Sequence, residues 1–213
     1  MKTSKRWFPI STDEIILIGS GGHARACVDV IELSAQFKIA GFIEKEEVCK
    51  MKNLRYSILG TDDDLGALRQ KYNNALITVG QLKSPDTRIK LFYLLQEMDF
   101  ILPVVISPTA YVSKHAMIGR GTIVMHGAIV NANAKIGQNC IINSKALIEH
   151  DAIIGDNCHI STGAIINGGV SVGGETFIGS GTITKQCISI KDRCIIGAGI
   201  VLKTDVASHQ LIR

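Results

Sequence analysis

A histidine between two acids is the part of this sequence best suited to proton transfer. The run Glu149-His150-Asp151 places an imidazole, whose ordinary pKa is about 6.5, beside two carboxylates. Such a ring accepts a proton from an attacking amine or hydroxyl near neutral pH, and a carboxylate bonded to it fixes its tautomer and stabilises the imidazolium. Neighbours in a strand point in opposite directions, so an acid reaches the ring only at a corner of the chain. Of the two acids we favour Asp151.

A glycine-rich turn near the start of the chain is the second candidate for chemistry. An apolar run ends in Gly19-Ser-Gly-Gly-His-Ala24, and a segment with helical periodicity follows. The turn matches G-x-G-x-x-A, in which glycines allow the backbone to approach a phosphate and the helix N-terminus offers free amides. Gly19, Gly21 and Gly22 are therefore predicted to bind substrate phosphate. The alternative is that these glycines only turn the chain.

Residues 1–103 are expected to form a small Rossmann-like βαβ domain that presents this turn. Strands are predicted over residues 14–19, 39–43 and 75–79, and helices after the turn and over residues 85–98. The second strand leads to Glu44, at about the distance where such folds contact a ribose hydroxyl, and the third ends at Gly80. Because this segment holds only half of a dinucleotide fold, a nucleotide or nucleotide sugar fits better than NAD.

An unbroken six-residue period begins near residue 106 and continues to residue 202. A small or β-branched residue follows each anchor by four positions, and Cys140, Cys158 and Cys194 fall on this second stripe. The anchors are Ile106, Val112, Ile118, Val124, Val130, Ile136, Ile142, Ile148, Ile154, Ile160, Ile166, Val172, Ile178, Thr184, Ile190, Ile196 and Leu202. A hexapeptide period is typical of the parallel β-helix, so residues 104–213 are predicted to form one, with inward-facing cysteines. Glycines that follow several anchors are expected where a corner needs positive φ or close approach.

Composition narrows the class of protein. The net charge of +4 comes from scattered residues without a basic run, which disfavours nucleic-acid binding. No apolar stretch follows the basic residues near the N-terminus, so we expect a cytoplasmic protein without a membrane span. None of the six cysteines forms a CxxC pair, which favours reduced thiols, and no recurring ligand spacing among the histidines suggests a metal.

Three motifs together resemble one family over nearly the whole chain. They are the Gly-x-Gly-Gly-His turn, the run Ile58-Leu-Gly-Thr-Asp-Asp-Asp-Leu65, and Leu147-Ile-Glu-His150 within the hexapeptide array. The chain resembles the bacterial sugar acetyltransferases of the sialic acid O-acetyltransferase (NeuD) and UDP-4-amino-sugar N-acetyltransferase (PglD) type. This resemblance implies a left-handed β-helix with three hexapeptides in each triangular coil, and a homotrimer. Apolar residues that flank the anchors, such as Ile129, Ile141, Ile153 and Ile165, are expected to face a partner in part.

The resemblance also implies roles for individual residues. His150 matches the family's general base, with Asp151 and Glu149 as its acidic neighbours. His159 matches a histidine near the acetyl thioester of acetyl-CoA, and its alternative is a solvated corner residue. Gly168, one coil from His150, is expected to offer its amide to the thioester oxygen. The remaining residues assigned to the two substrates are Gly179 and Gly197 for acetyl-CoA, and His23 and Asn143 for the sugar nucleotide. The alternative for Asn143 is an asparagine ladder at a corner of the β-helix.

Three functions remain open from the sequence. The first is transfer of acetyl from acetyl-CoA, without a metal, to the amine of a nucleotide-linked sugar, expected to be a UDP-4-amino-4,6-dideoxy sugar. The second is O-acetylation of sialic acid or a related nonulosonic acid, whose carboxylate requires a cationic partner such as Lys83 or Arg88. The third is a non-catalytic scaffold that binds sugar nucleotides. In the enzymatic cases a homotrimer would hold acetyl-CoA in the cleft between two β-helices.

Overall fold

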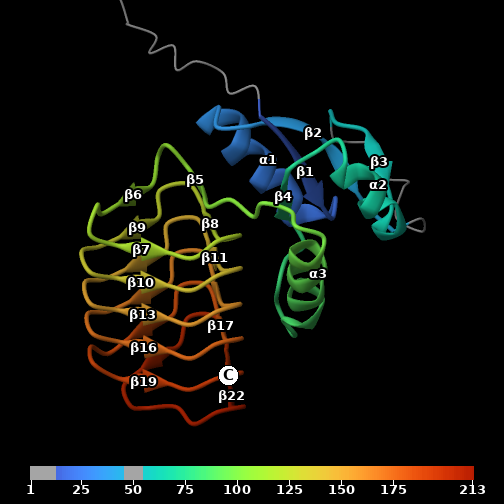
Figure 1. Ribbon diagram of the computed structural model, residues 1–213. Helices are drawn as coiled ribbons and strands as arrows, with labels where there is room; N and C mark the ends of the chain where they lie inside the picture. The colour runs from blue at the N-terminus through green and yellow to red at the C-terminus, as the bar shows by residue number, and fades with distance from the viewer. Residues whose placement is uncertain (1–12, 46–54) are drawn as a thin grey trace, which may run out of the picture.

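A four-stranded parallel sheet forms the N-terminal part of the protein (Figure 1). The computed structural model describes residues 13–45 and 55–213; Cys49 and the basic N-terminal residues lie outside this part. The strands are β1 (Glu14–Ile18), β2 (Lys38–Ile43), β3 (Ile58–Gly60) and β4 (Asn74–Ile77), in the order β3-β2-β1-β4. The sheet that the sequence predicts is confirmed, although β4 ends two residues before the expected Val79.

Helices cover both faces of this sheet. Helix α1 (Gly22–Ser34) packs on one face, and α2 (Leu65–Arg69) and α3 (Asp86–Glu97) pack on the other, with the 3₁₀-helix η2 (Asp62–Asp64) leading into α2. Helix α1 ends where Ala35 adopts a left-handed conformation and donates its N–H to the Ile31 carbonyl at 3.1 Å. No helix in the described part of the chain is both long and apolar enough to cross a membrane.

The carboxyl ends of three strands meet at one edge of the sheet. Gly19 follows β1, Glu44 follows β2, and Gly80 lies beyond β4. Gly19 has φ +97°, and a Cβ there would lie 2.6 Å from Val79 Cγ2, so only glycine fits this turn. In open parallel sheets this edge is where ligands bind, at the point where the strand order reverses.

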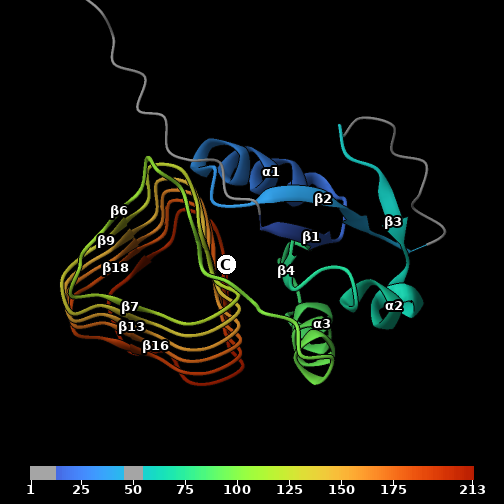
Figure 2. The ribbon, with the colours of Figure 1, turned by 45° about the horizontal axis from the view of Figure 1, so that its top comes forward.

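A parallel β-helix of triangular cross-section forms the rest of the chain (Figure 2). Face 1 consists of β5 (Val105–Ile106), β8 (Ile123–Val124), β11 (Ile141–Ile142), β14 (His159–Ile160), β17 (Phe177–Ile178), β20 (Ile195–Ile196) and β22 (Leu211–Ile212). Face 2 consists of β6 (Tyr111–Val112), β9 (Ile129–Val130), β12 (Leu147–Ile148), β15 (Ile165–Ile166), β18 (Ile183–Thr184) and β21 (Val201–Leu202). Face 3 consists of β7 (Met117–Ile118), β10 (Lys135–Ile136), β13 (Ile153–Ile154), β16 (Ser171–Val172) and β19 (Ser189–Ile190). Paired residues are eighteen apart, as Ile141 is from both Ile123 and His159, so the predicted fold class is confirmed.

The interior of the β-helix contains the two stripes that the sequence predicts. The second residue of each strand and the small residue four positions later form one continuous core, which includes Cys140, Cys158 and Cys194. The positive φ angles lie three residues after the anchors, as at Asp151 (φ +61°), and not at the glycines directly after them. Most of those glycines are required by close approach, since a Cβ at Gly179 would clash with the carbonyl carbon of Gly197, whereas a Cβ at Gly197 would lie 3.2 Å from its nearest neighbour.

The last coil is shorter than the others and extends the array beyond Leu202. Leu211 of β22 pairs with Ile195, only sixteen residues earlier, and an isolated bridge joins Val206 to Ile190. Val206 is buried in the same core as the anchors. The hexapeptide period does not predict this coil because two residues are missing from it.

The sheet and the β-helix share a hydrophobic core. Val105, Ile123, Met125 and Ile141 of the first coils are fully buried against helix α1 and one face of the sheet. The side chain of Ile141 therefore faces the N-terminal part, so Ile141 is not among the flanking residues that could face a partner copy. The domain boundary near residue 103 stays a prediction.

Candidate active site

A cleft of about 710 Å³ lies at the carboxyl edge of the sheet, where it meets the β-helix. It is lined by Gly19, Gly21, Gly22, His23, Glu44, Thr78, Val79, Gly80, Gln81, Leu82, Asn143, His159 and Ser161. Every residue that the sequence analysis assigns to the sugar nucleotide is in this set, although the residues come from both parts of the chain. The structure thus brings them together around one space.

The glycine turn leaves the start of α1 open to this cleft. A Cβ at Gly21 or Gly22 would meet no atom within 4 Å, so packing does not require glycine at either position. The N-cap residue Gly21 makes no side-chain cap, and the first turn of α1 contains no acid. Unpaired amides and the positive end of the helix dipole can therefore act on an anion in the cleft.

Glu44 stabilises the turn and gives the cleft a negative charge. Its Oε2 accepts the backbone N–H of Ser20 at 2.6 Å and the Ser20 hydroxyl at 2.8 Å. Partial burial alone would raise the pKa of Glu44, but these hydrogen bonds outweigh it and lower the pKa. The carboxylate is therefore ionised, and its other oxygen, Oε1, accepts the backbone N–H of Lys45 at 3.0 Å.

His159 is buried in the cleft and held in one tautomer. Its Nδ1 lies 2.6 Å from the Gln81 carbonyl oxygen, which can only accept, so Nδ1 carries the proton. Its Nε2 then accepts from Asn143 Nδ2 at 3.0 Å, an orientation that the Ser144 N–H fixes by bonding Asn143 Oδ1 at 2.8 Å. Burial lowers the pKa of His159 to about 4, so the ring is neutral near pH 7 and is not a solvated corner residue.

The sequence analysis missed Gln81, which joins the cleft to the β-helix. Its side-chain Nε2 donates to the Asn157 carbonyl at 3.0 Å, and the residue is only 2% exposed. No motif indicates this contact because it depends on how the loop after β4 lies over face 1.

His23 also lines the cleft. Burial, together with the positive charge of Arg88, lowers the pKa of His23 to about 3, so this ring is also neutral near pH 7. Its buried Nε2 has no hydrogen-bond partner among residues 13–45 and 55–213. A buried polar atom left unpaired in this way is a place where a ligand can supply the missing bond.

A second cavity, of about 700 Å³, adjoins the cleft and shares Gly19, Glu44 and Val79 with it. Its other walls include Asp62 and Asp63 of η2 and apolar residues of α3. Cleft and cavity together follow the whole carboxyl edge of the sheet.

His150 lies at a corner between faces 2 and 3, outside the cleft. Its Nδ1 is 2.8 Å from Asp151 Oδ2, and the left-handed conformation of Asp151 turns this acid back toward the preceding ring. Glu149 instead accepts the His150 backbone N–H at 3.2 Å, so the preference for Asp151 agrees with the geometry. The hydrogen bond to Asp151 raises the pKa of His150, whose side chain is 65% exposed.

Gly168 lies against the His150 ring, one coil further along. A Cβ at Gly168 would lie 2.8 Å from both Cε1 and Nε2 of His150, so any side chain here would displace the ring. Nε2 is the nitrogen that Asp151 leaves free, and Gly168 borders the space where it can accept a proton.

Gly179 and Gly197, the other glycines assigned to acetyl-CoA, lie on a different edge of the β-helix, in one column with two residues that line the cleft. Asn143, Ser161, Gly179 and Gly197 follow one another at eighteen-residue spacing along the corner between faces 1 and 2. The first two line the cleft and the glycines continue the same column. Within one chain the structure therefore separates His150 and Gly168 from His159, Gly179 and Gly197 by the width of face 2.

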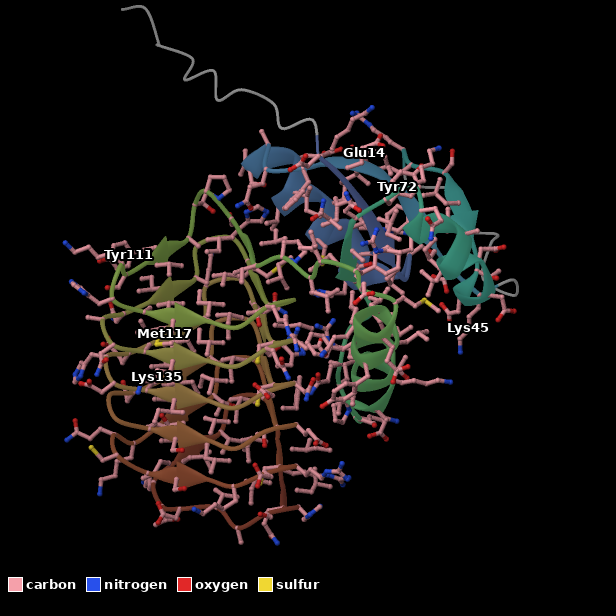
Figure 3. The ribbon with its side chains drawn as sticks, in the orientation of Figure 1. Glu14, Lys45, Tyr72, Tyr111, Met117 and Lys135 are labelled. Carbon is pink, nitrogen blue, oxygen red and sulfur yellow. The ribbon has the colours of Figure 1, made fainter. Side chains whose placement is uncertain are left out.

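Face 2, between these edges, carries an apolar ladder on its outer surface. The first residue of each strand points outward, and in this face all six are apolar: Tyr111, Ile129, Leu147, Ile165, Ile183 and Val201. Four of them are prominently exposed, from 38% at Ile183 to 58% at Tyr111. Figure 3 shows Tyr111 on the side away from the sheet. Exposed apolar patches of this kind are typical of interaction sites.

Neither cation proposed for a substrate carboxylate lies in the cleft. Arg88 is 1% exposed and donates to the carbonyls of Ile77 at 3.0 Å and Val79 at 2.7 Å, and to Asn139 Oδ1 at 2.8 Å. Lys83 lines a separate hollow of about 160 Å³. In the described part of the chain no three His, Cys, Asp or Glu residues are grouped to hold a metal ion.

Comparison with known families assigns both parts of the chain. Residues 14–93 match the PglD N-terminal domain. Residues 115–150 and 133–168 match the bacterial transferase hexapeptide, and residues 169–203 match the hexapeptide repeat of succinyl-transferase. The chain belongs to the hexapeptide-repeat sugar acetyltransferases with a PglD-type N-terminal domain, as the sequence motifs predict.

Solved structures give particular relatives. The chain is similar to PerB from Caulobacter crescentus in complex with CoA and GDP-perosamine, with 29% identity, 94% coverage of each chain and a TM-score of 0.87. It is also similar to the acetyltransferase domain of PglB from Neisseria gonorrhoeae FA1090 in complex with acetyl coenzyme A, with 26% identity, coverage of 94% and 96%, and a TM-score of 0.86. WeeI from Acinetobacter baumannii AYE, at 22% identity, shares the fold with a TM-score of 0.83 over 94% of this chain and 96% of that one. Comparison with curated protein sequences finds no match.

Proposed function

We propose that this enzyme transfers the acetyl group of acetyl-CoA to the amine of a nucleotide-linked amino sugar. The observation that carries this choice is the charge of the cleft. The described residues that line the cleft include no Lys or Arg, its two histidines are neutral, and Glu44 is ionised; Lys45 and Lys90 line only the adjoining cavity. A carboxylate such as that of sialic acid would find no cation there, whereas an amino sugar is compatible with this lining.

The walls of the cleft fit the parts of a sugar nucleotide. The diphosphate would lie against Gly21 and Gly22 at the start of α1, and the nucleoside would extend into the adjoining cavity beside Glu44. The sugar would then lie near His23 and Asn143. The matched structures of PerB with GDP-perosamine and of PglB with acetyl coenzyme A support both substrates.

The chemistry requires a base that takes one proton from the amine. The amine nitrogen attacks the thioester carbonyl carbon, the carbon–sulfur bond breaks, and CoA leaves as a thiolate that takes up a proton. His150 Nε2 accepts the proton of the amine, because Nδ1 bonds Asp151. The ionised Asp151 stabilises the imidazolium that forms, and the Gly168 amide is proposed to bind the oxyanion.

A homotrimer would unite the two separated groups of residues. A neighbouring copy packed against the apolar ladder of face 2 would place one edge, with His150 and Gly168, beside an edge of the other copy that carries the cleft column. Acetyl-CoA would then lie between two β-helices. The two groups flank the one face whose outer residues are all apolar, which supports this assembly.

A thiol-release assay tests the proposed reaction. Free CoA should be released with UDP- or GDP-linked 4-amino sugars, with the UDP-linked 4-amino-4,6-dideoxy sugar as our first choice, and not with free or CMP-linked sialic acid. Mass spectrometry of the product should show one added acetyl group on the amine. Turnover with sialic acid alone would favour O-acetylation, and sugar-nucleotide binding without turnover of any acceptor would favour the scaffold.

Mixing two inactive variants tests whether the site spans two copies. His150→Ala lacks the base and Asn143→Ala lacks a cleft contact, so each homotrimer should be nearly inactive. Mixed trimers contain sites with both wild-type residues, and random exchange should restore about a quarter of wild-type activity. Sedimentation of each variant checks that the trimer persists. Mixtures that stay inactive after demonstrated exchange would place the whole site within one chain.

A further inference from the structure

We infer that Asn133 is a positioning residue for the base, because its side-chain amide holds Asp151 in the orientation that bonds His150. The inference depends on the proposed role of His150 in the reaction. Asn133 belongs to the preceding coil and to none of the three motifs from which the family resemblance was drawn.

The contacts form a chain of three side chains. Asn133 Nδ2 donates to Asp151 Oδ1 at 2.6 Å, and Asp151 Oδ2 lies 2.8 Å from His150 Nδ1. Each carboxylate oxygen thus has one directed partner, and the plane of the carboxylate is fixed from both sides. A single bond to His150 would leave the carboxylate free to rotate about its Cβ–Cγ bond.

The backbone conformation of the coil allows the contact between Asn133 and Asp151 but does not require an asparagine at residue 133. Asn133 and Asp151 both have left-handed conformations, with φ +60° and +61°, and they stack eighteen residues apart. Glycine occupies the corresponding position at Gly127, Gly163 and Gly169. The turn itself therefore does not require a polar side chain at residue 133.

The pKa of His150 should depend on residue 133, because residue 133 contacts Asp151 and Asp151 contacts the His150 ring. The charged groups that act on the ring are Asp151 and, more weakly, Glu149, and the uncharged Gly168 covers the ring from the next coil. Each of these acids accepts a hydrogen bond from an uncharged asparagine of the preceding coil. Asn133 donates to Asp151, and Asn131 donates to Glu149 Oε2 at 2.9 Å. The hydrogen bond from Asn133 is the main cause of the lowered pKa of Asp151, which keeps this acid ionised.

Replacements of opposite charge at Asn133 test this role. Asn133→Asp adds a negative charge beside Asp151 and should raise the pKa of His150, whereas Asn133→Lys pairs with Asp151 and should lower it. Each shift should be roughly 0.3 to 0.7 pH units, the range of an exposed ion pair. Lysine and arginine fit this backbone, since Lys145 and Arg193 have the same left-handed conformation.

Two measurements on the full-length enzyme report the shifts. NMR titration of the His150 ring gives its pKa without reference to activity, and the acid limb of the rate profile should move with it, upward in Asn133→Asp and downward in Asn133→Lys. Asn133→Gly should lower kcat about tenfold, through loss of a hydrogen bond to a charged group, and leave both KM values unchanged.

Lys135→Gln is the matched control. It changes the net charge by the same amount as Asn133→Asp, on an exposed residue of the same coil that Figure 3 shows pointing away from the sheet, and it should leave the His150 pKa unchanged. Unshifted NMR titrations in both charge variants, or shifts of the same sign, would overturn the inference even if His150→Ala abolishes turnover. Full turnover in His150→Ala would instead contradict the proposed function, and the NMR titration would still decide whether Asn133 controls His150.

Discussion

His150→Ala should lower kcat by roughly 10²- to 10⁴-fold while the affinity for acetyl-CoA stays nearly unchanged. This range is the usual contribution of positioned proton transfer, and loss of a base acts on the chemical step and not on binding of the donor. Stopped-flow or thiol-release rates with the true acceptor measure kcat, and equilibrium binding measures the affinity. His115→Ala, at another exposed histidine of the β-helix, is the control and should keep full activity.

The pH dependence of the wild-type rate should identify the same group. The base acts only when neutral, so the rate falls as the pH drops through the pKa of His150. Because Asp151 raises this pKa, the acid limb should begin above the ordinary value of about 6.5. Asp151→Asn should move the limb to lower pH, and the limb should vanish from the residual rate of His150→Ala. An unaltered limb in His150→Ala would assign the titration, and the base, to another residue.

Gly22→Asp should raise the KM for the nucleotide sugar by roughly 100-fold or more and leave the KM for acetyl-CoA unchanged. The new carboxylate would meet no protein atom within 4 Å of its Cβ, so it enters the cleft without a clash. There it faces the substrate phosphates, and like charges brought together cost several kcal/mol in binding. An acid in the first turn is favourable for a helix, so α1 itself should not be weakened.

Gly66→Asp is the matched control for this variant. Gly66 lies in the first turn of α2, where a Cβ would also meet nothing within 4 Å. It is not among the lining residues of the cleft or of the adjoining cavity, so both KM values should stay at the wild-type level. An unchanged acceptor KM in Gly22→Asp would show that the phosphates bind elsewhere and that the glycines only turn the chain.

The repeating half of the fold could be predicted in detail because each coil repeats the same local requirement. An aliphatic anchor and a small residue four positions later face inward in every hexapeptide, so the sequence period specifies the core directly. The handedness of the coil has no such signal, since spacing is the same in either hand. The shortened last coil was not predicted, because its residues lie sixteen and not eighteen positions from their partners and so fall outside the six-residue period.

The site was predictable where its residues belong to local motifs and not where two distant segments meet. The glycine turn and the His150–Asp151 pair are encoded by adjacent residues. His159, in contrast, is buried because the loop that contains Gln81 lies over face 1, a contact between residues 78 apart. Arg88 was a candidate for binding substrate, but its place beneath β4 and against Asn139 follows only from the packing of α3.

The core that α1 shares with the first coils limits how such a chain can evolve by exchanging parts. Val105, Ile123, Met125 and Ile141 are closed off from solvent by residues of α1 such as Val28. A β-helix joined to a different N-terminal domain would expose these four side chains, unless that domain also packed a helix of complementary shape against them. Substitutions in α1 and in the first three coils should therefore covary among relatives.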